Sequence, residues 1–343
     1  MTDQLMEDLK RIDPLGTDGG EEPSPPTPAR IRNADQRTAA ALDRAVPCRR
    51  ARRRTATLAF AGALAAAAAA VALPGGSNEA SPSAIAALQS VAQIAAADAA
   101  VPRDGVTYQR VIETNVGTIV VGDGPQSAFS IRPRTMKEEW IAPDRSGRVR
   151  QVDQGAEFGG PRDERIWRDA GADPNLLDGP GGSSDISFGA GEANELSVEP
   201  ELPPVTELPA DPQELEVIFE AAASDGSVPT NVKVFEYAAA VLMHSAASPE
   251  LRAALYELVA GIDGVELDGD VRDPLDRTGT GVSIESDYSG ALRRSTLIFD
   301  PETSQPLAET QELLEPVTWI DSRLLGYTVL EESGQVASVR ERP

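Results

Sequence analysis

The fold class is decided by the stretch Thr280-Gly281-Val282-Ser283-Ile284-Glu285-Ser286, in which apolar and polar side chains alternate. Val282 and Ile284 fall on one side of an extended chain, and the polar residues fall on the other. This period of two is typical of an antiparallel strand with one buried and one solvated face. Further strands are expected nearby at residues 265–267, 295–299, 307–314, 326–330 and 335–339.

Three helices are expected before these strands. Ser248-Pro249 forms an N-cap and first turn, and Gly261 provides a stop. Between them, apolar residues recur at i, i+3, i+4, i+7 and i+8 from Leu251. Asp211-Pro212 starts a similar helix that runs to residue 222, and residues 232–244 form the third.

The preceding section adds a helix over residues 82–99 and strands at 106–114, 117–122, 128–132, 136–141 and 148–152. The turn at residues 143–147 uses Pro143 for its early φ and Gly147 for a late positive φ. An irregular, acidic section follows over about 155–209, as a lid or a mobile decoration. Because strands and helices do not alternate strictly, we expect an α+β domain, with an antiparallel sheet and helices on one face.

An arginine cluster lies directly before nineteen uncharged residues, 55–73. A helix of that length spans a hydrocarbon core of about 30 Å. Arginine clusters stay on the cytoplasmic side, so we expect a single-pass signal anchor with residues 75–343 outside. A soluble alanine-rich helix and a cleaved signal peptide are the alternatives. The residues predicted to anchor the chain are Arg49, Arg50, Arg52, Arg53, Arg54, Leu58, Phe60, Leu64, Val71 and Leu73.

The charge is strongly unequal along the chain. The whole sequence carries 31 basic and 55 acidic residues, a formal net charge of −24. Residues 1–54 contribute a net +2, so the remainder carries −26. Such a surface repels nucleic acid and anionic headgroups. The single cysteine, Cys48, precedes the span, so the outer domain must be stable without disulfides.

Residues 1–48 are expected to be a cytoplasmic tail, largely disordered, with short helices near residues 1–13 and 33–46. Neither helix is large enough to bury a core. The tail is therefore a candidate docking segment for a cytoplasmic regulator.

Catalytic motifs are absent from the sequence. The single histidine, His244, falls near a helix end, where a charged imidazole complements the helix dipole. Four carboxylates near residue 270 do not have EF-hand spacing, so we expect a solvated turn rather than a Ca²⁺ site; they are Asp268, Asp270, Asp273 and Asp276. Neighbouring acids such as Glu138-Glu139 cannot be ranked as acid–base pairs without distances. No cofactor or metal is expected.

Several segments resemble an actinobacterial family of single-pass membrane proteins of unknown function: residues 139–148, 208–212, 251–256 and 297–303. The resemblance covers most of residues 49–343 and implies no catalytic residues. The plan is also distantly similar to RseB/MucB and LolA-type domains. Those domains are curved, open half-barrels of antiparallel strands that sense or carry lipid-like ligands. The similarity implies a curved, half-barrel-like sheet here.

These observations favour a membrane-anchored extracytoplasmic binding or sensing module with an apolar or peptide ligand, and not an enzyme. The alternative is an envelope-stress or transcription-coupling protein whose tail binds a regulator such as a sigma factor. A hydrolase that uses only carboxylates has no sequence marker.

Overall fold

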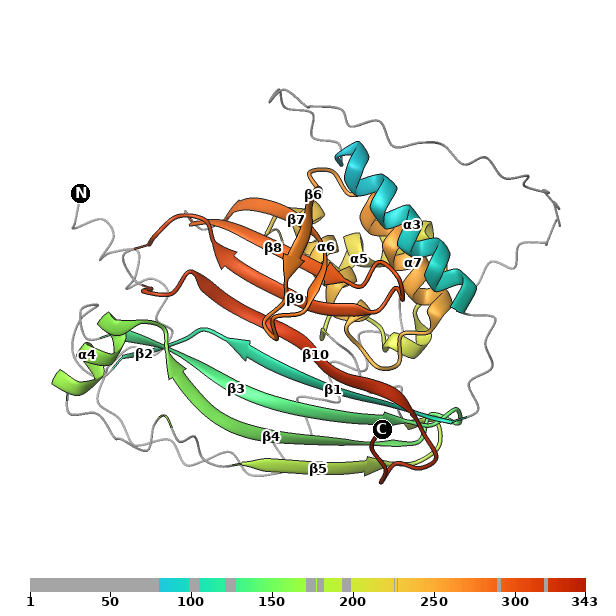
Figure 1. Cartoon of the computed structure of the whole chain (residues 1–343), viewed down its shortest axis with the longest axis horizontal. Coiled ribbons are helices and arrows are strands. Elements are labelled where there is room, and N and C mark those ends of the chain that lie inside the picture. The colour runs from blue at the N-terminus through green and yellow to red at the C-terminus, as the bar shows by residue number, and fades with distance from the viewer. Residues whose placement is uncertain are drawn as a thin grey trace, which may run out of the picture. The chain divides into compact units, whose positions relative to one another are not determined.

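The computed structural model describes residues 80–343 except 99–104, 121–127, 171–176, 178–181, 193–198, 225, 227, 289–290 and 318–319. These residues form an α+β domain with a large open antiparallel sheet and a few helices (Figure 1). The predicted α+β class with an antiparallel sheet is confirmed. The predicted membrane helix and the cytoplasmic tail lie outside the described residues.

The sheet follows the strand order β5-β4-β3-β1-β10-β9-β8-β7-β6, and β2 pairs with β3 beside this path. Each described strand pair is antiparallel. Strand β10 pairs with β1 and so joins two segments that lie far apart in the sequence. The strands are β1 (Val106–Asn115), β2 (Gly117–Val120), β3 (Ala128–Ile141), β4 (Gly147–Phe158), β5 (Ser183–Phe188), β6 (Glu266–Arg272), β7 (Thr278–Tyr288), β8 (Ala291–Phe299), β9 (Pro306–Leu313) and β10 (Leu324–Val336).

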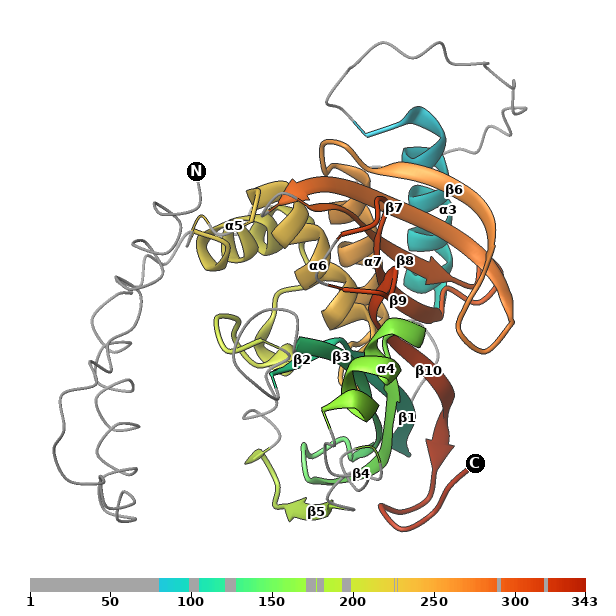
Figure 2. The same cartoon turned by 90° about the vertical axis from the view of Figure 1, so that its left-hand side faces the viewer.

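The structure describes five α-helices, of which four pack on the half of the sheet that contains β7 and β8 and the fifth contacts β3 and β4. They are α3 (Pro82–Asp98), α4 (Pro161–Asp169), α5 (Pro212–Ala222), α6 (Thr230–Leu242) and α7 (Pro249–Ala260). All except α4 share one apolar cluster with β7 and β8. Figure 2 shows α5, α6 and α7 grouped beside these strands. Within this cluster the rings of Tyr256 and Phe299 meet edge to face, 5.4 Å apart.

The predicted N-caps of α5 and α7 are confirmed. Asp211 accepts hydrogen bonds from the backbone N–H groups of Gln213 and Glu214, and Ser248 accepts one from Leu251. These side chains satisfy N–H groups that have no partner within a helix. The start of α6 is two residues earlier than expected, at Thr230.

Replacing Asp211 with alanine is expected to lower the free energy of unfolding by about 1 kcal/mol, because the start of α5 loses its cap. Urea unfolding followed by circular dichroism measures the change. Glu216→Ala is the matched control, since Glu216 is exposed in the same helix and should leave stability within about 0.5 kcal/mol. Equal effects of the two substitutions would contradict the assignment of the cap.

In two places, a pair of strands expected from the sequence is one continuous strand in the structure. The expected strands 128–132 and 136–141 are both part of β3, which continues through Pro133. The register shifts between Pro133 and Thr135, and pairing with β1 stops at Arg134. Pro133 therefore lies beyond the paired length of β1, where its missing N–H costs no ladder bond on that side. Similarly, β10 includes both 326–330 and the start of 335–339.

The section expected to be irregular, about 155–209, is only partly so. It contains the end of β4, helix α4 and strand β5. Strand β5 is short and exposed at the edge of the sheet, which explains its weak apolar pattern.

The turn between β3 and β4 differs from its prediction. Arg145, and not Gly147, has the positive φ, at 62°. Gly147 is instead the first residue of β4, where a side chain would come within 2.6 Å of the Phe188 ring. The glycine is required by close approach rather than by turn conformation.

Candidate functional site

The residues predicted to anchor the chain in a membrane lie outside the described part of the chain: Arg49, Arg50, Arg52, Arg53, Arg54, Leu58, Phe60, Leu64, Val71 and Leu73. Among the helices that the structure describes, none has the length and apolar character needed to cross a bilayer. The anchor therefore stays a prediction.

The acidic cluster on β6 and its following turn is divided between different partners. Asp273 is buried and organises the turn by accepting from the backbone of Leu275 and from the backbone and side chain of Arg277. Asp276 pairs with Arg272. Within the described ranges, no group of three or more histidine, cysteine or acidic side chains is arranged to hold a metal ion.

The neighbouring acids Glu138 and Glu139 point to opposite faces of β3, because successive strand residues alternate. Glu139 is buried against the end of the helical layer, where Ser245 donates to it at 2.5 Å. Glu138 is buried on the other face, among arginines. The two carboxylates therefore cannot act together on one substrate.

His244 lies beside Glu139, with its Nε2 3.9 Å from the Glu139 carboxylate. The His244 side chain is buried, and burial lowers its pKa, which favours the neutral imidazole over the charged one expected at a helix end. Its Nδ1 accepts from the backbone N–H of Ala246. Because Ser245 donates to the carboxylate and not to the imidazole, these residues do not form a nucleophile–base pair.

Glu139 is ionised. Burial alone would raise its pKa, but the charges of His244, when protonated, and Lys137, together with the Ser245 hydrogen bond, lower it to about 2. Lys137 lies 2.7 Å away and keeps the carboxylate charged when His244 is neutral. This set fixes the end of α6 on the sheet, with the side chain of Gln109 donating to the Met243 carbonyl.

A cavity of about 500 Å³ lies between α6 and the middle of the sheet. Its walls come from β1, α6 and strands β7 to β10, together with residues of the loops before α5 and α6. Such a volume is typical of small-ligand sites. Six charged side chains line it: Glu113, Glu199, Lys233, Glu236, Arg293 and Glu309.

The carboxylates outnumber the cations in this wall by four to two. Burial raises the pKa of Glu113, Glu199 and Glu236. Burial and the negative charges of Glu236, Glu199 and Glu113 raise the pKa of Glu309 to about 8. Glu236 accepts hydrogen bonds from Ser295 at 3.1 Å and from Gln311 at 3.4 Å. The cavity wall is therefore acidic, because its carboxyl groups outnumber its cationic side chains.

A smaller cavity of about 210 Å³ continues from this one, because both have Glu113, Ala240, Glu309 and Thr328 in their walls. It ends at the Lys137–Glu139 pair. The space between α6 and the sheet is thus lined with polar groups along much of its length. We call the two together the interlayer cavity.

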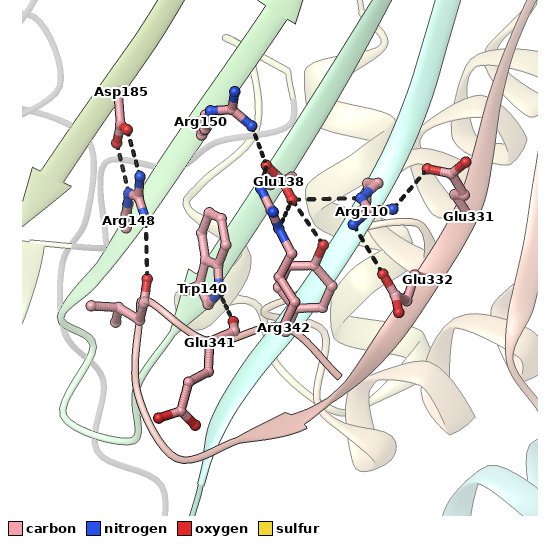
Figure 3. Close-up of polar contacts among 12 residues, drawn as sticks. Arg110, Glu138, Trp140, Arg148, Arg150, Asp185, Glu331, Glu332, Glu341 and Arg342 are labelled. Carbon is pink, nitrogen blue, oxygen red and sulfur yellow. Dashed lines mark hydrogen bonds and ion pairs between the residues drawn. The ribbon is translucent and has the colours of Figure 1, made fainter.

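The opposite face of β3 carries a second polar centre around Glu138, shown in Figure 3. The Glu138 side chain is fully buried, yet it accepts from Arg150 at 2.8 Å and from Arg342 at 2.6 and 2.8 Å. Tyr108 donates at 3.0 Å, and Arg110 lies at 3.5 Å. Burial alone would raise the pKa of Glu138, but bonds from Arg342, Arg150 and Tyr108 lower it to about 2.

A scan of protein-family models finds no match to this chain, and a search of curated proteins finds none either. The resemblances to the actinobacterial family and to the RseB/MucB and LolA-type domains therefore stay predictions.

Sequence reasoning missed both polar centres. The cavity acids Glu113, Glu236 and Glu309 lie on β1, α6 and β9, and no spacing links them. One signal was present: each is a charged residue within an otherwise half-apolar strand or helix. For Glu138, the useful signal was its position in a strand between Trp140 and Met136, on the same face as apolar residues.

Proposed function

We propose that this protein is a membrane-anchored, extracytoplasmic binding or sensing module that holds a cationic ligand in the interlayer cavity. The observation that best supports this proposal is the acidic wall of that cavity, which contains four glutamates and two cationic side chains. The module is non-catalytic in this proposal, because the described residues near the cavity have no nucleophile–base pair.

The chemistry of the wall favours a polar, cationic ligand over an apolar one. An apolar ligand would bury Glu113, Glu236 and Glu309 without giving them partners, which is costly. An ammonium or guanidinium group would pair with them and lower their pKa values. A basic peptide side chain or a polyamine has this chemistry. The peptide part of the expected ligand class is thus better supported than the apolar part.

The finer architecture is part of this proposal. A curved, half-barrel-like sheet with helices on one face would place the interlayer cavity on the inner side, as in RseB/MucB and LolA-type domains. The analogy is architectural, and the polar wall departs from a lipid-like ligand. The anchor at residues 49–74 would place this domain outside the membrane. Its acidic surface does not suit nucleic acid.

The alternative, an envelope-stress or transcription-coupling role, depends on residues 1–46 binding a cytoplasmic regulator. Those residues lie outside the described part of the chain. The two roles are compatible, since ligand capture outside can be the input of a sensor. A pull-down with the tail, with sigma factors among the captured proteins, would favour the coupling role.

The binding proposal is tested with spermidine as the probe and the full chain in lipid nanodiscs. At ten times the Kd, spermidine is expected to raise Tm by about 3–6 °C. Glu309→Gln should lose most of this shift, because the most strongly perturbed carboxylate of the cavity is gone. Glu257→Gln removes an exposed carboxylate from α7 and is the matched control.

Equal shifts in both variants would mean that spermidine binds the acidic surface and would contradict the proposal. Binding of the neutral dye N-phenyl-1-naphthylamine, after subtraction of empty nanodiscs, with no spermidine shift would favour an apolar ligand instead.

A further inference from the structure

The residues after β10, Ala337–Pro343, turn back over the outer face of β1, β3 and β4 (Figure 3). We call them the 337–343 segment. The segment forms a turn, in which the Glu341 backbone N–H donates to the Ser338 carbonyl at 3.1 Å. This face of β3 is opposite to the one that lines the interlayer cavity.

The segment is recognised through its main chain as well as its side chains. Trp140 Nε1 donates to the Glu341 carbonyl at 2.6 Å, and Arg148 donates to the Val339 carbonyl at 3.5 Å. The Val339 side chain packs on the apolar cluster that contains Tyr108 and Trp140. Arg342 makes two bonds to Glu138. Val339 and Arg342, three residues apart, are thus each bound by side chains of the sheet, the first through apolar packing and the second through Glu138.

The receiving side chains are held by the sheet without help from the segment. Arg148 is paired twice with Asp185, at 2.5 and 2.7 Å, and lies 4.9 Å over the Trp140 ring. Glu138 keeps Arg150 and Tyr108 as partners. We call Tyr108, Glu138, Trp140 and Arg148 the Glu138 site. Such partners keep a site ready to bind before its ligand arrives.

The segment itself is held less firmly than the site. The Arg342 side chain is 49% exposed, whereas that of Glu138 is fully buried. Arg340 and Glu341 are also exposed. The Glu138 site is thus held in place by the sheet, whereas the 337–343 segment that fills it is partly exposed. This arrangement is expected of a docking site that is filled by a segment of its own chain.

We propose that the Glu138 site is a docking site for a turn-shaped protein segment with an apolar residue three positions before an arginine, and that the 337–343 segment is its exchangeable internal occupant. A partner segment of this chemistry would displace it. Tethering gives the internal occupant an effective concentration of roughly millimolar, so the partner must bind more tightly or the internal contact must be weakened. The site is separate from the interlayer cavity and does not depend on the cationic ligand.

The test uses the full chain and a fluorescent peptide with the sequence of residues 337–343, followed by anisotropy. Wild type is expected to bind the peptide weakly, because the site is filled. Arg342→Ala weakens the internal occupant and should bind the peptide at least about tenfold more tightly, the value of one charge-assisted contact. Adding Glu138→Gln to that variant should remove the gain, as should the Arg342→Ala change in the peptide.

Arg340→Ala is the matched control, because it removes an exposed arginine from the same segment and should behave as wild type. Equal peptide binding by wild type and Arg342→Ala would overturn the proposal. Loss of folding in Arg342→Ala, seen by circular dichroism, would also overturn it, since the segment would then be an inseparable part of the fold. Spermidine binding should be the same in wild type and in folded Arg342→Ala, so the cavity proposal is tested separately.

Discussion

Replacing Glu138 with alanine is expected to lower the free energy of unfolding by about 3–5 kcal/mol. The carboxylate is fully buried and accepts from Arg150, Arg342 and Tyr108. Without it, Tyr108 loses a buried partner and the arginines crowd one another. Because Arg150 and Arg342 are partly exposed, the effect should lie near the lower end of the range. Urea unfolding of the full chain, followed by Trp fluorescence and circular dichroism, measures it.

Glu332→Ala is the matched control for Glu138→Ala. Glu332 also pairs with an arginine of this face, Arg110, at 3.1 Å, but its side chain is 33% exposed. Its loss should cost less than about 1 kcal/mol. Equal costs for the two substitutions would contradict the central place of Glu138.

The pH dependence of stability gives a second signature of Glu138. The folded-state pKa of Glu138, about 2, is below the ordinary value of 4.5. Between these two pH values the folded protein therefore binds fewer protons than the unfolded chain. The stabilisation is therefore full above pH 4.5 and is lost as the pH falls towards 2. Glu138→Ala should flatten this acid limb, whereas Glu332→Ala should leave it unchanged.

Replacing Glu309 with glutamine is expected to stabilise the protein at pH 8 by about 2–4 kcal/mol, with little effect at pH 4. The folded-state pKa of about 8 is raised above 4.5, so the folded protein holds a proton that the unfolded chain releases. Stability is thus lost as the pH rises from 4.5 to 8. Glutamine cannot ionise and removes this loss. Thermal unfolding between pH 4 and 9 measures the difference.

Glu257→Gln on α7 again serves as the control and should change Tm equally at every pH. A Glu309→Gln variant that melts with the same pH profile as wild type would show that the cavity does not perturb this carboxylate. It would remove the electrostatic basis for cation binding.

Local chemistry made several elements predictable from sequence. The caps Asp211 and Ser248 marked the starts of α5 and α7, because their hydrogen bonds are formed within three residues. The alternation at Val282 and Ile284 similarly marked β7, and both side chains are buried, but the expected solvated face is wrong at Ser283, which is buried as well. These signals need no knowledge of the rest of the fold.

Long-range pairing was not predictable in the same way. The strand order places β10 beside β1, more than 200 residues earlier, and no local signal encodes that register. Both polar centres depend on it. Glu138 meets Arg342 only because β10 ends beside β1, and Glu309 meets Glu113 only because β9 lies one strand further along the sheet. Adjacent acids such as Glu138 and Glu139, by contrast, were brought to opposite faces.

The most direct test of cation binding is the calorimetric titration of spermidine into the full chain at pH 7, in two buffers that differ in ionisation enthalpy. At this pH Glu309 is mostly protonated, so a cation that pairs with it must displace the proton. We predict saturable binding with release of about one proton in wild type and close to none in Glu309→Gln. Absence of saturable binding, or the same proton release in both proteins, would contradict the account.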